Sequence, residues 1–339
     1  MAEQTQKPPT RRRFRACYVC SRRLAALAAA AAVLAPPACA QPAGFDLQAH
    51  RGGRGETTEE SLRGFAKSIE LGVTTIEFDV ELTADGQPVV WHDPTIEPEK
   101  CADTAPASPG DPEYPYVGKL VHDLTLVQIR TLDCGRRLEG FPRAEVVRGN
   151  KIAVLQEIFA LADSYRAEVR YNIETKVEAD RPAKSADPQQ FVDVILAAVR
   201  SAGKADLVEI ESFDWRILPM VRRVAPSIPL VALWDDKTWV PGSPWLAGVD
   251  PTLVGDPLIG AVMVGADIAS PDFVAVDKAL VDRAHALGRR VVPWTVNDAA
   301  AMRQQIADGV DGLITDYPTL LRSVLAELGR PLPPAYHRR

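Results

Sequence analysis

Apolar positions along the chain follow two alternating patterns. Short runs that are apolar at every second residue, or apolar throughout, predict strands, whereas longer runs with apolar residues three and four apart predict helices. The expected strands cover residues 45–50, 74–82, 88–91, 168–176, 207–212, 229–233, 267–269, 290–295 and 312–315. The expected helices cover residues 58–71, 125–132, 155–164, 188–201, 215–224, 276–287, 299–307 and 319–328.

The order of these elements predicts the fold. Strands alternate with helices over about 250 residues, which indicates a parallel α/β protein. The count of about eight strand–helix units favours a closed (β/α)8 barrel, the TIM barrel. A doubly wound open sheet is the alternative. No G-x-G-x-x-G turn follows the first strand, which argues against a dinucleotide site.

The first expected helix carries a prediction of its own. It begins at Thr58 and places Glu59 and Glu60 in its first turn, where the helix dipole favours acidic side chains. Gly72 is expected to end it, because glycine is the usual residue just after a helix.

Residues 94–150 interrupt the alternation after the second strand region. Six prolines lie between positions 94 and 115, and the segment contains one short expected helix. A loop of this length inside a compact domain is usually functional. We therefore expect an irregular insertion that overhangs the site at the strand ends.

The first forty residues are predicted to be a cleaved secretion signal. Seven basic residues lie between positions 7 and 23, an apolar run of Ala, Leu and Val covers 24–35, and an A-x-A site ends at Ala40. The apolar run is too short to span a bilayer comfortably, so we expect no stable membrane span. The alternative, an apolar core helix, is disfavoured by the prolines that follow the run. Residues 41–339 are then one exported barrel domain, periplasmic or secreted, and Sec, twin-arginine and lipoprotein export stay open.

Net charge limits the partners of the chain. The 339 residues are 46% hydrophobic and carry a net charge of -6, which becomes -12 when the seven positive charges and one negative charge of residues 1–40 are removed. An acidic surface disfavours nucleic acid and anionic membranes as non-specific partners. An anionic substrate would therefore need a metal ion or arginines to compensate its charge.

Two cysteines remain after removal of the signal, Cys101 and Cys134. An even pair in an oxidising compartment suggests one disulfide. Such a bond would stabilise the fold on the order of 3 kcal/mol by closing a loop of just over thirty residues. Two free thiols are the alternative.

Charged residues gather where the first expected strands end. His50 and Arg51 close the first strand, and His92 follows the short strand at 88–91. Glu77 and Asp79 lie two residues apart on one strand, so their side chains share a face. In a TIM barrel the carboxyl ends of the strands form the active site, and we expect these residues to converge there. A structural ion pair or a core histidine is the alternative for each residue taken alone.

The next long strand supplies a third carboxylate. Asn172, Glu174 and Lys176 share one face of it, and a polar face inside a barrel must be paired or must bind a ligand. Three convergent carboxylates without thiolates suit a hard cation such as Ca²⁺ or Mg²⁺ rather than zinc. A simple ion pair between Lys176 and Glu174 is the alternative.

These residues lie in a series of motifs with which the chain resembles the glycerophosphodiester phosphodiesterase family. The family motifs H-R-G-x-x-G, E-x-D, H-D, N-I-E-x-K, S-F-D, W-T-V-N and D-G-[IL]-I-T-D-x-P match, in this order, residues 50–55, 77–79, 92–93, 172–176, 212–214, 294–297 and 311–318. The chain departs at 58–61, where it has Thr-Glu-Glu-Ser in place of P-E-N-T. This difference bears on substrate choice more than on catalysis.

The resemblance implies a (β/α)8 barrel that hydrolyses small-molecule glycerophosphodiesters to glycerol 3-phosphate and an alcohol, with Ca²⁺ or Mg²⁺ as cofactor. By the family pattern, the metal ligands are Glu77, Asp79 and Glu174, the acid–base pair is His50 and His92, and the phosphate-facing cations are Arg51 and Lys176. Phe213 and Trp294 are expected to wall the pocket, with packing at the barrel end as the alternative.

Two other functions stay open. The insertion and the altered residues 58–61 suggest a related phosphodiesterase that acts on lysophospholipids or lipid head groups. A non-catalytic secreted binding protein is the third possibility, although no acid–base or metal position is missing. The chain lacks a G-x-S-x-G elbow and a P-loop, so a serine hydrolase or NTPase has no support.

Overall fold

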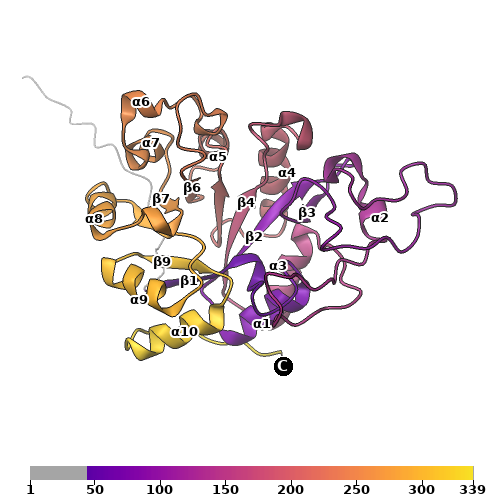
Figure 1. Ribbon diagram of the computed structural model, residues 1–339, viewed down its shortest axis with the longest axis horizontal. Coiled ribbons are helices and arrows are strands. Elements are labelled where there is room, and N and C mark those ends of the chain that lie inside the picture. The colour runs from indigo at the N-terminus through magenta and orange to yellow at the C-terminus, as the bar shows by residue number, and fades with distance from the viewer. Residues whose placement is uncertain (1–43, 339) are drawn as a thin grey trace, which may run out of the picture. The chain divides into compact units, whose positions relative to one another are not determined.

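The computed structural model describes residues 44–338, and the secretion signal expected at 1–40 lies outside the described residues. The strands are β1 (Asp46–Ala49), β2 (Thr75–Leu82), β3 (Pro88–Val90), β4 (Arg170–Thr175), β5 (Val208–Ser212), β6 (Leu230–Trp234), β7 (Ile268–Pro271), β8 (Arg290–Val291) and β9 (Gly312–Thr315). The helices are α1 (Leu62–Leu71), α2 (Leu126–Ile129), α3 (Leu155–Tyr165), α4 (Pro188–Ser201), α5 (Ile217–Val224), α6 (Pro251–Val254), α7 (Pro257–Met263), α8 (Lys278–Ala286), α9 (Ala299–Asp308) and α10 (Pro318–Glu327) (Figure 1). Short 3-10 helices are η1 (His50–Gly52), η2 (Val121–Asp123), η3 (Pro182–Lys184), η4 (Pro244–Leu246) and η5 (Phe273–Ala275). Over residues 44–338, none of the helices has the length and apolar content needed to cross a membrane.

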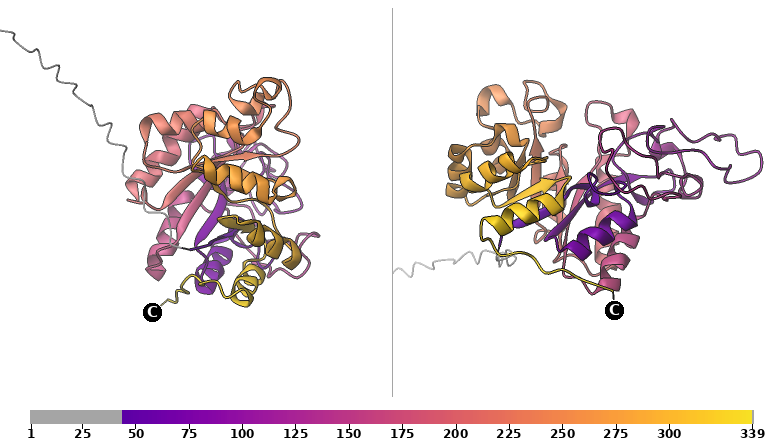
Figure 2. Two further views of the ribbon diagram at one scale, coloured as in Figure 1. Left: turned by 90° about the vertical axis from the view of Figure 1, so that its left-hand side faces the viewer. Right: turned by 60° about the horizontal axis from the view of Figure 1, so that its bottom comes forward.

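Eight parallel strands form a nearly closed barrel. They neighbour one another in the order β8-β7-β6-β5-β4-β2-β1-β9, and β3 pairs antiparallel with β2. Near the two end strands, the amide of Asp311 donates to Val291 O at 2.9 Å and the amide of Ile314 donates to Pro293 O at 3.0 Å. Helices pack around the outside of the strands (Figure 2). The predicted TIM-like barrel is confirmed, and the open doubly wound sheet is excluded.

The alternation within β2 separates the outer core from the barrel interior. Ile76, Phe78 and Val80 are fully buried in the main hydrophobic core. Burying each of these side chains stabilises the fold by roughly 1.5–3 kcal/mol. Glu77 and Asp79, at the intervening positions, therefore point to the opposite face, into the barrel.

The barrel interior is polar and hydrogen-bonded within itself. Asn172 Nδ2 donates to Gln48 Oε1 at 3.0 Å and to Glu211 Oε2 at 2.7 Å, and Gln48 Nε2 donates to Glu209 Oε1 at 3.0 Å. These four side chains are buried. At this level most of the expected inward polar face is paired within the protein, although Asn172 Oδ1 and Glu209 Oε2 accept no hydrogen bond from the described residues. Glu174 lies two residues further along β4.

The first predicted helix begins four residues later than expected. Ser61 is its N-cap, and the Ser61 Oγ accepts a hydrogen bond from the amide of Gly64 at 3.0 Å. Glu60 has a φ of 52°, which a right-handed helix cannot contain. The prediction that Glu59 and Glu60 occupy the first helical turn is therefore wrong. Both side chains are buried instead, and Glu60 Oε1 accepts the amide of Asp79 at 3.1 Å.

Residues 94–150 form an irregular insertion with a small hydrophobic core of its own (right-hand side of Figure 1). Trp91, Ile96 and Tyr116 are among its buried side chains. The short helix predicted at 125–132 is α2, and Thr125 caps it. Cys101 and Cys134 lie in the same core and are joined by a disulfide.

Loss of this disulfide is expected to destabilise the protein. It joins residues 33 positions apart, and freeing a loop of that length costs roughly 3 kcal/mol in the chain-entropy account. For a chain of this size that corresponds to a drop in Tm of about 5 °C. Thermal unfolding of the Cys101→Ser/Cys134→Ser double variant measures the drop, and the wild type in reductant should match it. An unchanged Tm in both would contradict the prediction.

Candidate active site

The loop after β1 turns sharply and brings His50 and Arg51 to the mouth of the barrel. Arg51 has a φ of 50°, a left-handed conformation that costs a non-glycine residue roughly 1–2 kcal/mol. Its amide donates to Glu77 Oε2 at 2.8 Å, which holds the strained turn against β2. A Cβ on Gly55 would lie 2.5 Å from the Tyr317 ring, so glycine is required where this loop meets the start of α10.

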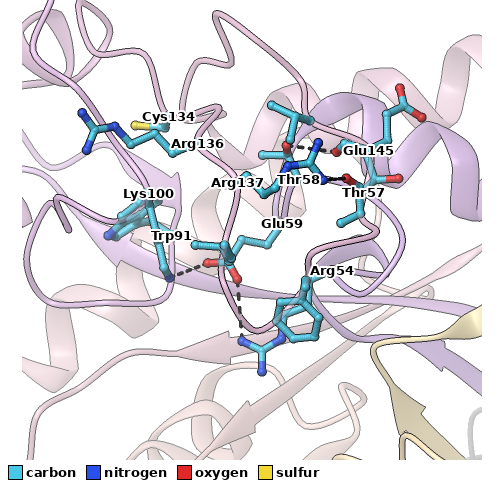
Figure 3. Close-up of a pocket in the computed structure, with 14 residues that line it drawn as sticks. Arg54, Thr57, Thr58, Glu59, Trp91, Lys100, Cys134, Arg136, Arg137 and Glu145 are labelled. Carbon is cyan, nitrogen blue, oxygen red and sulfur yellow. Dashed lines mark hydrogen bonds and ion pairs between the residues drawn. The ribbon is translucent and has the colours of Figure 1, made fainter.

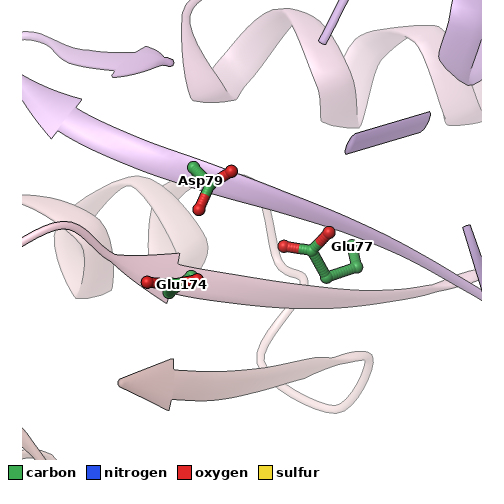
Figure 4. Close-up of side chains that lie close together, drawn as sticks. All are labelled: Glu77, Asp79 and Glu174. Carbon is green, nitrogen blue, oxygen red and sulfur yellow. The ribbon is translucent and has the colours of Figure 1, made fainter. Parts of the chain in front are cut away.

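Three carboxylates converge at the ends of β2 and β4. Glu77 and Asp79 come from β2 and Glu174 from β4, and the register places Asp79 beside Glu174 (Figure 4). One oxygen of each carboxylate lies within 4.8 Å of the others, and all three side chains are buried. The structure thus brings together the three acids that the sequence predicted as metal ligands.

These carboxylates fit a hard divalent cation. Burial raises the pKa of Glu174 to about 7, and Asp79 adds to the rise while Lys176 opposes it. Burial also raises the pKa of Glu77 well above its usual range, together with the nearby charges of Asp79 and Glu211. Within residues 44–338, Asp79 forms ion pairs with Arg51 and Lys176, but neither of its side-chain oxygens accepts a hydrogen bond of good geometry. The carboxylate oxygens would coordinate a bound cation, and its charge would stabilise all three acids in their ionised form.

His50 is held by a carboxylate from the last strand of the barrel. Its Nδ1 lies 2.5 Å from Asp316 Oδ1, and the same carboxylate accepts from Asn297 Nδ2 at 2.7 Å and Arg54 Nε at 2.9 Å. Burial lowers the pKa of His50, although Asp316 opposes this shift. The other ring nitrogen, Nε2, faces the acid cluster and lies 4.0 Å from Glu77 Oε2.

His92 has a similar support. Its Nδ1 lies 2.9 Å from Asp93 Oδ1, and Asp93 also forms an ion pair with Lys100. The protein around the ring removes hydrating water and, together with the positive charges of Arg51 and Lys176, lowers the pKa of His92 to about 3. Since the pKa of His50 is lowered as well, both rings are predominantly neutral near pH 7 before a ligand binds.

Arg51 and Lys176 both contact the acid cluster. Arg51 Nε lies 3.0 Å from Asp79 Oδ2, and Lys176 Nζ lies 2.7 Å from Glu174 Oε1. Burial disfavours the ammonium of Lys176, but Glu174 and Asp79 outweigh it and raise its pKa. The ion pair between Lys176 and Glu174 that the sequence offered as an alternative is present, and it keeps a fixed positive charge at the cluster.

A pocket with an empty volume of about 530 Å³ opens at these strand ends. Its lining includes the predicted residues His50, Arg51, Glu77, His92, Glu174, Lys176, Phe213 and Trp294. The rings of Phe213 and Trp294 meet edge to face with centroids 5.4 Å apart, and Trp294 Nε1 donates to Ser270 O at 2.8 Å. These two residues therefore both wall the pocket and pack at the barrel end.

Comparison with known proteins identifies the family. Residues 50–320 match the model of the glycerophosphoryl diester phosphodiesterase family. The chain belongs to this family. It is 27% identical over 292 residues to the glycerophosphodiester phosphodiesterase of Caldanaerobacter subterraneus, a match that covers 83% of this chain and 98% of the relative. A human lysophospholipase D is 24% identical over 288 residues, which cover 81% of this chain and 84% of the relative.

Solved structures share the barrel of this family member. A crystal structure from Silicibacter pomeroyi DSS-3, named for the same family, superposes with a TM-score of 0.72 at 30% identity and covers 85% of this chain and 95% of its own. An Oleispira antarctica phosphodiesterase gives a TM-score of 0.63 at 18% identity, with 84% and 97% covered, which shows the fold alone. The protein is thus a glycerophosphodiester phosphodiesterase, a phosphoric diester hydrolase.

Four residues at the site of this phosphodiesterase were not predicted as site residues from the sequence. Asp316 lies in the closing motif directly after β9, and this position at a strand end could have indicated a site residue. Glu211 lines the pocket and alternates with Glu209 on β5, so the inward polar pattern of that strand indicated it. Arg54 and Lys100 lie in loops, where periodicity gives no indication.

Replacement of Asp316 by asparagine is expected to lower kcat of this phosphodiesterase roughly 100-fold, because the His50 ring loses its charged support. Asp316 raises the pKa of His50, so removal of its charge favours the neutral imidazole. The limb of the pH–rate profile that belongs to His50 should therefore move to lower pH, whether His50 acts as the acid or as the base. Steady-state kinetics on a glycerophosphodiester across pH 5 to 9 provide the measurement.

The matched control for this substitution is Asp308→Asn. Asp308 lies at the end of α9 and accepts a hydrogen bond from Gln304 at 3.1 Å, away from the acid cluster. This control changes the net charge equally and should leave the profile in place. A wild-type profile in Asp316→Asn would show that Asp316 does not position His50.

Proposed function

We propose that the protein hydrolyses glycerophosphodiesters to glycerol 3-phosphate and an alcohol, with two-histidine acid–base catalysis and a divalent metal. One arrangement carries the proposal: His50 and His92 line the same pocket as Glu77 and Glu174 of the three-carboxylate cluster. The Oleispira antarctica phosphodiesterase was solved in complex with the product sn-glycerol-3-phosphate, which supports this class of product here.

Glu77, Asp79 and Glu174 would hold the metal, Ca²⁺ or Mg²⁺. When bound, the ion would offset negative charge on the non-bridging oxygens of the phosphate. Arg51 and Lys176 line the same pocket and would add fixed positive charge around the phosphodiester. This charge matters because a phosphodiester anion repels an approaching nucleophile.

The two histidines would move the protons. The glycerol 2-hydroxyl would attack phosphorus while one histidine, in its neutral form, takes its proton. The other histidine must be protonated in the complex with the anionic substrate, and it would give this proton to the leaving alkoxide, which departs as the alcohol. Water then opens the resulting cyclic phosphate with the two roles exchanged. The Nδ1 atom of His50 is hydrogen-bonded to Asp316, so Nε2 is the nitrogen available for proton transfer. Phe213 and Trp294 would wall the space beside the glycerol.

The variants His50→Ala and His92→Ala are each expected to lose glycerol 3-phosphate release by roughly 1,000-fold, because a positioned acid or base contributes about 10²–10⁴-fold. An enzyme-coupled assay for glycerol 3-phosphate, with glycerophosphoethanolamine as substrate, measures the loss. His337→Ala, an exposed histidine near the C-terminus, is the control and should retain full activity. Full activity of His50→Ala would refute the proposed mechanism.

Removal of the metal is expected to abolish hydrolysis and to leave the fold intact. Excess chelator should stop the reaction, and Ca²⁺ or Mg²⁺ added back should restore it, since the cluster depends on an ion to offset charge. Glu174→Gln removes one charged ligand, so it should need roughly 10-fold more metal for half-maximal activity. Isothermal titration calorimetry with each ion gives the affinity without relying on turnover. Undiminished hydrolysis in excess chelator would contradict the proposal.

A second candidate is a phosphodiesterase that acts on lysophospholipids. Its support is the similarity to a human lysophospholipase D over most of both chains, together with the insertion beside the site. Preference for acylated over deacylated substrates of the same head group would favour it.

We also propose that the protein is exported, to the periplasm or out of the cell. The disulfide between Cys101 and Cys134 supports an oxidising compartment. The secretion signal predicted at 1–40 remains a prediction, because it lies outside the described residues. Peptide sequencing of the mature N-terminus would establish whether cleavage follows Ala40.

A further inference from the structure

A second pocket, which we call the insertion pocket, adjoins the catalytic one and has an empty volume of about 390 Å³ (Figure 3). Its walls come from the loop after β1, from Trp91 and from the insertion at 134–146. Arg54 lines both pockets, and its Nε donates to Asp316, the carboxylate that holds His50. The two pockets therefore meet at the Arg54 side chain.

The acid in the wall of the insertion pocket is already compensated. Glu59 is 7% exposed and forms an ion pair with Lys100, and Arg54 NH1 and Arg51 NH1 lie 3.6 Å and 3.7 Å from its Oε2. Figure 3 shows Lys100 and Arg54 joined to this carboxylate. These cations also contact Asp79, Asp93 and Asp316, so acids and cations form one paired network here. Glu59 is therefore not a free acid for a cationic ligand.

Glu145, the second acid of the pocket lining, forms ion pairs with residues outside the pocket. Glu145 is half exposed, and its carboxylate contacts Lys67 at 3.1 Å and Arg63 at 3.5 Å. Neither Lys67 nor Arg63 lines the insertion pocket. The charge of Glu145 is therefore balanced from outside the pocket.

The two aromatic rings of the insertion pocket already form cation–π contacts with side chains of the protein. Lys100 Nζ lies 5.0 Å from the centroid of the Trp91 ring, and Arg54 Cζ lies 4.8 Å from the centroid of the Phe141 ring. Proteins bind quaternary ammonium groups such as choline by stacking them on such ring faces. A choline head group would have to displace Lys100 or Arg54 to reach them.

Two arginines of the lining have no carboxylate partner within residues 44–338. Arg136 NH1 donates to Pro98 O at 2.5 Å, and Arg137 NH1 donates to Pro142 O at 2.6 Å and to Ala144 O at 3.1 Å. Main-chain carbonyls carry no net charge, so neither guanidinium is neutralised by a direct ion pair among the described residues. Both side chains are exposed, and Glu99 and Glu139 line a neighbouring pocket with them. Each guanidinium has five N–H donors and retains several for a ligand.

We propose that the insertion pocket binds the alcohol side of the substrate when that alcohol carries a phosphate group of its own. This inference rests on the proposed glycerophosphodiester hydrolysis. Arg136 and Arg137 supply charge and bidentate donors for a second phosphate, which guanidinium groups bind well. The preferred substrate class is therefore a glycerophosphodiester with an anionic head group, either a phosphate monoester or a second phosphodiester.

A matched pair of substrates isolates the charge of the head group. Glycerophosphoglycerol and its derivative with a terminal phosphate on the outer glycerol differ only in that phosphate. At low ionic strength, kcat/KM of the wild type should be roughly 10-fold or more higher for the phosphorylated compound, and the ratio should shrink as salt is added. Bis(glycerophospho)glycerol carries a second phosphodiester in place of the terminal phosphate monoester, so it shows which of the two anionic groups the pocket prefers. Preference for either anionic compound over glycerophosphoglycerol supports the inference.

Substitution of the arginines tests their assignment. The Arg136→Gln/Arg137→Gln double variant should lower this kcat/KM ratio roughly 10-fold, and Arg136→Glu should lower it further by repelling the second phosphate. The bonds of Arg137 to Pro142 and Ala144 help to hold the insertion, so Arg136→Glu is the second variant in case the double variant unfolds. Arg148→Glu, at an exposed position of the insertion outside the pocket lining, changes the net charge by the same two units as either variant and should leave the ratio unchanged.

The outcomes separate this inference from the proposed function. Hydrolysis of none of the glycerophosphodiesters would refute the proposed function itself. Hydrolysis with equal rates on the matched pair, or with glycerophosphocholine preferred, would overturn the inference and leave the proposed function standing. Higher activity on lysophosphatidylcholine than on every deacylated compound would assign the pocket to an acyl chain instead and would also overturn it.

Discussion

Compensation of buried negative charge is the constraint on which the site depends. Glu77, Asp79 and Glu174 bring three carboxylates within 4.8 Å of one another in a place that water scarcely reaches. Without opposite charge such a group would hold protons rather than stay ionised, as the raised pKa values of Glu77 and Glu174 show. Arg51 and Lys176 provide part of that opposite charge. A divalent cation could supply the remainder, which is why we propose this cluster as the metal site.

Closure of the barrel completes the catalytic machinery. β9 pairs with β1, which brings Asp316, at the end of the last strand, onto His50, 266 residues earlier in the chain. Asn297 and Arg54 fix the orientation of the Asp316 carboxylate, so the His50 ring is held through a network that spans both ends of the sequence. The local motif at His50 thus gains the support for its proposed acid–base role only when the eight strands have come together.

The insertion adds walls to the site that the barrel itself does not supply. The barrel supplies the acids and histidines, whereas residues 94–150 supply most of the walls of the adjoining pocket. This segment has its own small core and a disulfide, which hold Arg136 and Arg137 in place without a helix or strand to support them. Arg54 connects the two regions, because it contacts Asp316 on one side and Glu59 on the other. Function in such folds resides in loops that a rigid scaffold positions.

The sequence by itself determined the alternation of strands and helices, the barrel, and the set of acids and histidines at the strand ends. Those features follow from local periodicity and from motifs, and the side chains of Glu77 and Asp79 share a face simply because a strand has a period of two. Tertiary structure decided what periodicity cannot express. Glu59 forms ion pairs with buried cations and does not lie in a helical turn, because the helix begins only after its N-cap, Ser61. The partners of His50 and Arg136 were likewise fixed only by folding. The contact of His50 with Asp316 spans 266 residues and depends on barrel closure, and the contact of Arg136 with Pro98 depends on how the irregular insertion packs, so neither follows from a local pattern.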